Sequence, residues 1–170
     1  KELKKDPIKY LLKLYVKFHE EANKDLEDQA RAEFKNLENN NKEAIKLWEE
    51  FKSLSLKDFN KIYNLLNISF ESHKGEAFYN DKMKPITKEL KNKKLLEESE
   101  GAFIVNLEKY NLPPALIMKK DLATLYMTRD LAAAKHRHKT YKFNKMIYEV
   151  GSEQSLHFKQ LFKILELMGN

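Results

Sequence analysis

Two short stretches between Thr124 and Phe158 combine polar side chains in positions where chemistry could take place. The first stretch contains Tyr126 and Asp130, and the second contains Gln154 and His157. In each of them an expected strand gives way to an expected helix. Ligands bind at such turns in parallel α/β sheets, because side chains and free helix N–H groups converge at the carboxyl ends of the strands. The two stretches are therefore candidate parts of a ligand site.

Each pair also has a simpler interpretation. Tyr126 and Asp130 are four residues apart, so Tyr126 could pack in the sheet while Asp130 complements a helix N-terminus. Gln154 and His157 are three residues apart and share one helix face, where they could be ordinary exposed polar residues. Spacing alone leaves both interpretations open.

Metal binding is not expected. His19-Glu20 resembles the start of a zinc-protease motif, but the position that needs a second histidine is Asn23. His136 and His138 are two residues apart, which turns them roughly 200° from each other on a helix. Their basic run is typical of a cationic last helical turn, and nucleic-acid contact there is the alternative. The chain has no cysteine, so disulfides and thiolate ligands are excluded.

The composition is that of a soluble globular protein, with 34% charged and 42% hydrophobic residues among 170. No apolar run approaches the roughly 18 residues of a membrane span, so we expect a cytoplasmic protein without membrane contact. The net charge of +6 comes almost wholly from lysine, because only Arg31, Arg129 and Arg137 are arginines. Lysine lacks the planar fork of arginine and supports loose polyanion attraction. A non-catalytic Lys-rich RNA-binding or interaction module is therefore the alternative function.

The periodicity predicts an α/β protein in three parts. Residues 1–68 contain no Gly and only Pro7, and they predict helices over 7–22 and 25–38, a third around 44–51 and a fourth that starts with a capping box at Ser55. Residues 69–120 predict a helix over 80–91. Short apolar runs at 101–107 and 115–118, with a further run just beyond this region at 123–127, predict a small antiparallel meander.

Residues 121–170 read as strand, helix, strand, helix, with the second strand over 145–150. Two such units in a row predict a parallel sheet with right-handed crossovers. Glu149 places a charge in the second strand, so we expect that strand to be partly uncovered.

Two motifs at the C-terminal end carry a resemblance to a known family. The residues concerned are Thr124-Leu-Tyr-x-Thr-Arg-Asp-Leu-Ala-Ala133 and Tyr148-x-Val-Gly-Ser-Glu-Gln-x-Leu-His-Phe-Lys-Gln-Leu161. They closely resemble arginyl-tRNA synthetases, which are class I aminoacyl-tRNA synthetases. Upstream segments resemble the same family in the same order, among them Asp6-Pro-Ile-Lys-Tyr10, Gly75-Glu-Ala-Phe-Tyr79 and Tyr110-Asn-Leu-Pro-Pro114.

The resemblance implies a Rossmann-like catalytic domain interrupted by an insertion. Residues 1–68 would be the helical insertion, 69–120 a mixed connecting region, and 121–170 the start of the second half of the nucleotide-binding fold. The family's His-x-Gly-His motif and lysine loop are both absent, and the chain starts at Lys1 without Met. We therefore expect an internal piece of the catalytic domain that is inactive alone and monomeric.

The resemblance also implies residue roles. Asp130 and Tyr126 match the positions that bind the guanidinium of L-arginine, and Gln154 matches a residue that holds the amino-acid head group. A carboxylate with a phenolic neighbour suits a planar guanidinium.

Gly151, Glu153 and His157 match the positions where the adenosine of ATP docks. The implied reaction forms arginyl-adenylate with the help of Mg²⁺ and transfers arginine to tRNA(Arg). It uses positioning and electrostatics, with no covalent protein nucleophile and no metal ligand assigned to this chain.

Overall fold

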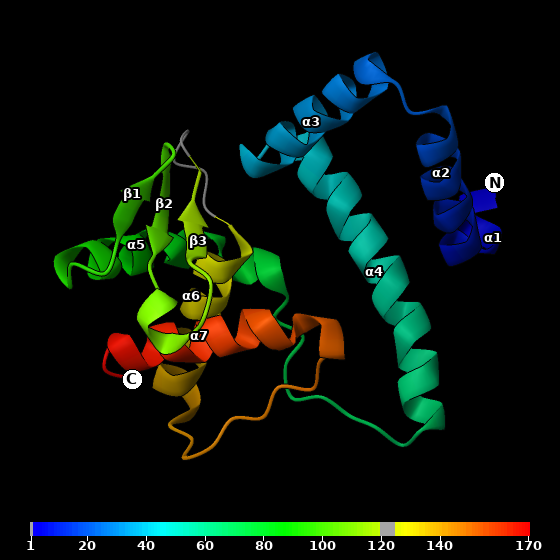
Figure 1. The fold of residues 1–170 in the computed structure, drawn as a ribbon. Coiled ribbons are helices and arrows are strands. Elements are labelled where there is room, and N and C mark those ends of the chain that lie inside the picture. The colour runs from blue at the N-terminus through cyan, green and yellow to red at the C-terminus, as the bar shows by residue number, and fades with distance from the viewer. Residues whose placement is uncertain (1, 120–124) are drawn as a thin grey trace. The chain divides into compact units, whose positions relative to one another are not determined.

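The computed structural model describes residues 2–119 and 125–170 of the chain. The chain forms two compact units, Lys1–Ser72 and His73–Asn170, whose elements are drawn in Figure 1. Within the described residues, no helix is both long enough and apolar enough to cross a membrane.

The first unit is helical, with α1 (Glu2–Lys5), α2 (Pro7–Glu21), α3 (Lys24–Glu38) and α4 (Lys42–Leu65). Side chains cap the three longer helices at their N-termini. The carboxylate of Asp6 accepts from Lys9 N, and the amide oxygens of Asn23 and Asn41 accept from the first turns of α3 and α4. Each cap satisfies backbone N–H groups that have no partner within the helix.

The predicted helix start at Ser55 is wrong, because Ser55 lies inside α4, which runs unbroken for 24 residues. A capping box stabilises a new helix only where the preceding helix has ended and left N–H groups free. No Gly or Pro lies between Lys42 and Leu65. The backbone hydrogen bonds of α4 therefore continue past Ser55.

The apolar faces predicted for the first unit are only partly covered. Neither α2 nor α4 contains a fully buried residue. Leu12, Phe34 and Ile62 are exposed, while Trp48 and Phe51 are half-buried. The first unit thus lacks a fully buried core in the residues that the structure describes.

The second unit contains a small antiparallel sheet of β1 (Glu97–Ser99), β2 (Ala102–Val105) and β3 (Ala115–Met118), in that order. Glu100 and Gly101 join β1 to β2, and both have positive φ values, 51° and 77°. A two-residue hairpin turn of this kind needs φ > 0 at both positions, which glycine adopts without strain. The prediction of a small antiparallel strand region is confirmed, although β1 was not among the predicted strands.

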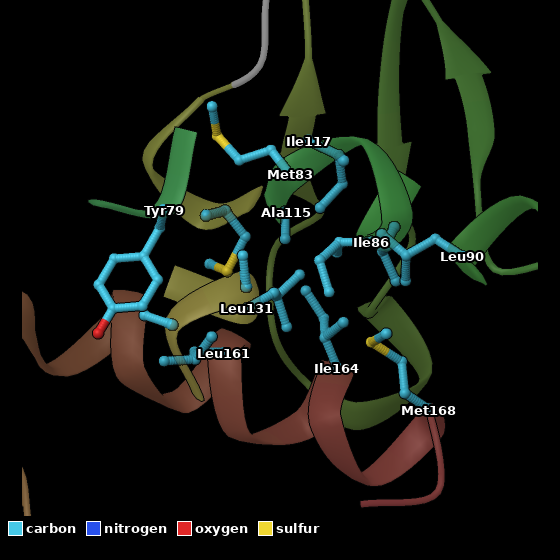
Figure 2. Close-up of a cluster of buried hydrophobic side chains, with 14 of the residues drawn as sticks. Tyr79, Met83, Ile86, Leu90, Ala115, Ile117, Leu131, Leu161, Ile164 and Met168 are labelled. Atoms are coloured by element: carbon cyan, nitrogen blue, oxygen red, sulfur yellow. The ribbon is translucent and has the colours of Figure 1, made fainter. Parts of the chain in front are cut away.

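The second unit has six helices in the part of the chain that the structure describes. They are η1 (Glu76–Lys82), α5 (Met83–Asn92), η2 (Glu108–Tyr110), α6 (Tyr126–Tyr141), η3 (Ser152–Gln154) and α7 (Ser155–Leu167). Helix α6 contacts β3, α5, η1 and α7. Figure 2 shows Leu131 of α6 among Ile86, Ile117, Leu161 and Ile164, side chains that come from α5, β3 and α7. This is the hydrophobic core of the unit.

The predicted parallel arrangement of residues 121–170 is not confirmed. Residues 120–124 lie outside the described residues and include the first two residues of the predicted strand 123–127, whereas Tyr126 and Met127 belong to α6. Residues 145–150 form no strand. Ile147 is 76% exposed and Glu149 is also exposed, so these side chains are not covered as they would be in a parallel strand. A parallel strand needs hydrogen-bonding neighbours and covered faces, and no described strand lies beside this segment.

Candidate functional site

The first turn of α6 is tied to the end of β3. The Thr128 hydroxyl is buried and donates to the Ile117 carbonyl over 2.6 Å, and the Leu125 backbone N–H donates to the same carbonyl over 3.3 Å. Ala132, Ala133 and Ala134 follow as a buried run of small side chains that allows close packing. The start of α6 is therefore fixed relative to the sheet.

Tyr126 and Asp130 lie on one face of this fixed turn, four residues apart. Tyr126 is 67% exposed, so it does not pack in the sheet. The guanidinium carbon of Arg129 lies 5.8 Å from the centre of the Tyr126 ring. The Asp130 side chain is 39% exposed, which leaves its carboxylate accessible from solvent.

Helix α7 is anchored by contacts of its own with the Pro113–Pro114 turn and the core. The Gln160 side chain is buried, and its amide donates to the carbonyls of Pro113 and Pro114 over 2.9 and 3.3 Å. Leu161 is completely buried in the core. At the helix start, the Ser155 hydroxyl donates to the Ser152 carbonyl over 2.6 Å. These contacts fix where the side chains of the first two turns of α7 lie.

Gly151 precedes η3 and has φ −66° and ψ 149°, an extended conformation that any residue adopts. A Cβ atom at this position would overlap the Glu153 carboxylate, which folds back over the glycine. Glu153 is an exposed, flexible side chain whose carboxylate can rotate away, so neither this overlap nor the backbone angle requires glycine here.

One hydrogen bond joins the two polar stretches. Asp130 Oδ2 on α6 and His157 Nε2 on α7 are 2.6 Å apart, although the residues are 27 positions apart in the chain. An ionised carboxylate only accepts hydrogen bonds, so the imidazole donates from Nε2. The two partners are partly buried, with side-chain exposures of 39% and 29%. The sequence placed both residues in candidate stretches but did not predict this contact.

The two arginines of α6 make their contacts with groups other than Asp130 and His157. Arg129 Nη1 donates to Glu76 Oε2 over 2.7 Å. The guanidinium carbon of Arg137 lies 5.7 Å from the Tyr79 ring centre and 5.8 Å from the Tyr148 ring centre. Neither arginine neutralises Asp130 directly. The sequence signal that could have found them is their rarity, since only three arginines occur among 32 basic residues.

The Tyr148 and Arg137 side chains influence each other's ionisation. Burial raises the pKa of the Tyr148 hydroxyl, the positive charge of Arg137 opposes that shift, and the negative charge of Asp130 adds to it. Burial lowers the pKa of Arg137, but the neighbouring Tyr79 and Tyr148 outweigh burial and raise it above its ordinary value. Both groups therefore keep their protons at neutral pH, and Arg137 stays cationic.

The other predicted site residues are not drawn into this contact. Tyr126 and Gln154 are exposed, and neither side chain makes a hydrogen bond with another described residue. Gln154 donates through its backbone to the Gly151 carbonyl over 3.0 Å. The structure thus pairs Asp130 with His157 and leaves the Tyr126 hydroxyl and the Gln154 amide exposed to solvent.

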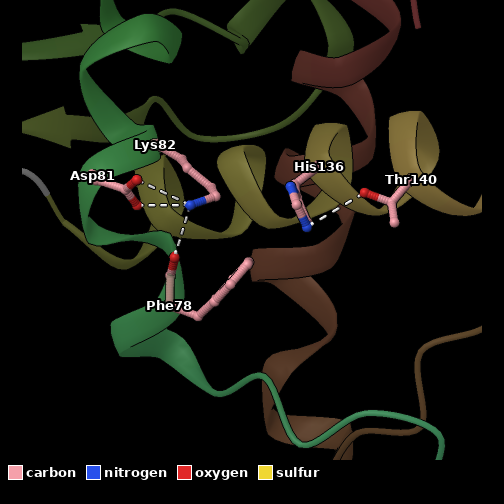
Figure 3. A network of polar contacts seen from close by, with 5 residues as sticks. All are labelled: Phe78, Asp81, Lys82, His136 and Thr140. Atoms are coloured by element: carbon pink, nitrogen blue, oxygen red, sulfur yellow. Dashed lines mark hydrogen bonds and ion pairs between the residues drawn. The ribbon is translucent and has the colours of Figure 1, made fainter.

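The basic end of α6 packs on aromatic rings of η1. The His136 ring lies 5.1 Å from the ring of Phe78, and Figure 3 shows the polar contacts around these residues. Lys82 Nζ bonds the Phe78 carbonyl and both Asp81 carboxylate oxygens, at 3.2, 2.8 and 3.1 Å. His138 instead lies edge-on to Phe143. The polar groups of Lys82 and Asp81 bond to each other and to the backbone, so these contacts do not point to a ligand site. In the part of the chain that the structure describes, no three His, Asp or Glu side chains come together to hold a metal ion.

Comparison with known proteins gives relatives along the full chain. An arginine–tRNA ligase of Clostridium beijerinckii is 58% identical over 170 residues, which are 99% of this chain and 30% of that protein. An arginine–tRNA ligase of Clostridioides difficile is 58% identical over 166 residues, covering 96% of this chain and 29% of that protein. The chain thus spans about 30% of the length of these curated relatives.

A solved structure gives the same result for the fold. The crystal structure of arginyl-tRNA synthetase from Plasmodium falciparum matches with a TM-score of 0.75 at 26% sequence identity, over 94% of this chain and 30% of that chain. The family model described as class I tRNA synthetases (R), catalytic domain, matches residues 1–170. This chain belongs to the class I tRNA synthetase (R) catalytic-domain family.

Proposed function

We propose that this chain is part of an arginine–tRNA ligase, which activates L-arginine with ATP and transfers it to tRNA(Arg). Two relatives that carry this name are 58% identical along nearly the whole chain. Because the chain spans about 30% of their length, the complete reaction belongs to the full-length enzyme. The 170 residues alone are expected to be inactive.

The finer fold assignment is part of the same proposal. Residues 1–68 are the helical insertion, 69–120 the connecting region, and 121–170 begin the second half of the Rossmann-like domain. Residues 145–150 become a parallel strand once the neighbouring strands of the full-length enzyme are beside them. The exposure of Ile147 and Val150 supports this, since apolar side chains at the centre of a parallel sheet are normally covered.

Arginine recognition is assigned to Tyr126, Asp130 and Gln154. The observation that carries this assignment is the hydrogen bond between Asp130 and His157, which brings the two polar stretches together. Asp130 has no arginine or lysine partner among the described residues. A partly buried carboxylate with a phenol on the same helix face suits a planar cation. Gln154, at the start of α7, would bind the amino-acid head group.

ATP recognition is assigned to Gly151, Glu153 and His157. Gly151 has no side chain, which supports a close backbone approach of the ligand at this turn once the flexible Glu153 carboxylate has rotated away. The full-length enzyme would use Mg²⁺ to neutralise the ATP phosphates, and the described residues offer no ligand cluster for it. The described residues would position arginine and adenosine so that the arginine carboxylate attacks the α-phosphorus and pyrophosphate leaves.

We also propose that the full-length enzyme is cytoplasmic and monomeric.

The substitution Asp130→Asn in the full-length enzyme tests the proposed function. The guanidinium of the substrate would lose its charged partner, so binding of the transition state should weaken by on the order of 2–5 kcal/mol. The value of kcat/KM for arginine should then fall about 30-fold or more. Arginine-dependent ATP–pyrophosphate exchange measures this. Asp25→Asn, an exposed carboxylate on α3, is the matched control and should change nothing. Adenylate formation with unaltered kinetics in the Asp130→Asn enzyme would overturn the assignment.

A further inference from the structure

His157 has a fixed position next to Asp130. It lies on α7 three and four residues before Gln160 and Leu161, the two residues that anchor this helix to the Pro113–Pro114 turn and to the core. Its ring stands edge-on to the Phe158 ring, with centroids 5.4 Å apart and planes at 85°. Because its helix is anchored, the imidazole presents Nε2 to Asp130 from a defined position and favours one orientation of the carboxylate.

The backbone of Asp130 is fixed as well. Thr128 ties its helical turn to the Ile117 carbonyl, and the adjacent Leu131 is completely buried. The carboxylate therefore retains mainly the freedom to rotate about its own side-chain bonds. The hydrogen bond from His157 Nε2 to Oδ2 removes that freedom.

The hydrogen bond leaves acceptor capacity for a ligand. Oδ1 of Asp130 accepts no hydrogen bond from another described residue, and Oδ2 has a second lone pair. A guanidinium presents two parallel N–H groups to a carboxylate, so it could still bind both oxygens. The nearest arginines do not compete, because Arg129 bonds Glu76 and Arg137 faces Tyr79 and Tyr148.

We infer that His157 is a positioning residue for arginine recognition: it holds the Asp130 carboxylate in the orientation that receives the guanidinium of the substrate. This inference rests on the proposed function. It rests on the arginine part of that function and, for His157 alone, replaces the ATP contact assigned above with the contact to Asp130. The two roles affect different substrates, because an adenosine contact would act on ATP and a positioning contact acts on arginine.

The experiment compares His157→Ala and His157→Gln in the full-length enzyme by ATP–pyrophosphate exchange, with arginine and ATP varied in turn. His157→Ala should raise KM for arginine about tenfold, as expected for loss of a hydrogen bond to a charged group, with KM for ATP within about twofold. The glutamine amide can donate in place of Nε2–H, so His157→Gln should recover most of the affinity for arginine. His138→Ala, a histidine on the exposed end of α6, is the matched control.

A double-substitution cycle separates positioning from general damage. If His157 acts through Asp130, adding His157→Ala to the Asp130→Asn enzyme should change KM for arginine by less than about twofold. A rise in KM for ATP alone, a fall in kcat with both KM values unchanged, or a full additive loss in the double variant would each overturn the inference.

Failure of the proposed function gives a different result. In that case the wild-type enzyme would show no arginine-dependent exchange, or Asp130→Asn would leave its arginine kinetics unchanged. The inference fails by itself when the wild-type and Asp130→Asn enzymes behave as proposed and His157→Ala does not. Thermal unfolding of each variant, with His157→Gln as the less disruptive change, identifies losses that come from misfolding.

Discussion

Asp130 illustrates how a single side chain acquires a role through its surroundings. Its carboxylate is partly buried on an anchored helix, bonded to an imidazole and free of ion pairs with arginine or lysine among the described residues. Its negative charge also acts on Tyr148. Burial is the main cause of the raised pKa of the Tyr148 hydroxyl, and Asp130 raises that pKa further. A partly buried carboxylate without such an ion pair favours a cationic ligand that donates N–H hydrogen bonds, such as a guanidinium.

His136 provides a pH prediction at the residue scale. Partial burial lowers its pKa below 6.5, and the nearby charges of Lys74, Lys82 and Arg137 add to the shift, against the smaller opposing effect of Asp81. The folded protein therefore binds this proton less readily than the unfolded chain does. The contribution of His136 to stability should rise with pH up to about 6.5 and then stay constant.

The measurement is an NMR titration of His136 together with the free energy of unfolding at several pH values. The His136 midpoint should fall below 6.5, and His136→Gln should remove that part of the pH dependence. A midpoint above 6.5 would contradict the packing of His136 against Phe78 and Tyr79.

At the scale of the elements, α6 organises the second unit because it contacts the sheet, α5 and α7 together. Its connection to β3 depends on the buried Thr128 hydroxyl. Thr128→Val keeps the shape of the side chain but removes the donor to the Ile117 carbonyl. We expect a loss of about 1–3 kcal/mol in the free energy of unfolding, measured by urea denaturation of the 170-residue chain.

Thr140→Val is the control for this substitution, because Thr140 lies exposed on the same helix and its hydroxyl makes only a long contact, 3.4 Å, with His136 Nε2. It should change the free energy of unfolding by less than about 0.5 kcal/mol. Equal effects of the two substitutions would show that the Thr128 hydrogen bond contributes little to holding α6 on the sheet.

For the whole molecule, the largely exposed segment 145–150 is the proposed contact between this chain and the rest of its domain. Ile147 is 76% exposed, so Ile147→Lys should change the stability of the 170-residue chain by less than about 0.5 kcal/mol. In the full-length enzyme the same lysine would lie in a covered parallel strand and should cost several kcal/mol. Thermal unfolding of both proteins makes the comparison, and equal effects in the two would rule out a covered strand at 145–150.

Much of the local structure was predictable from the sequence. Asp6-Pro7 marks a helix start by chemistry that acts within one turn. The caps at Asn23 and Asn41 and the hairpin at Glu100-Gly101 act over equally short range, but only the structure identified them. The two polar stretches were also recognisable from residue type and spacing. The helix boundary at Ser55 was not, because a capping pattern is ambiguous wherever the preceding helix can continue through it.

By itself, the sequence determined the helical first unit, the small antiparallel region and the candidate residues, since these depend on interactions between near neighbours in the chain. Only the tertiary structure decided that His157 bonds Asp130, that Gln160 anchors α7, and that 145–150 forms no strand in this chain. Each of these depends on groups distant in sequence. A side-chain hydrogen bond requires two helices to be packed at the right distance, and a strand requires neighbours that no local pattern can supply.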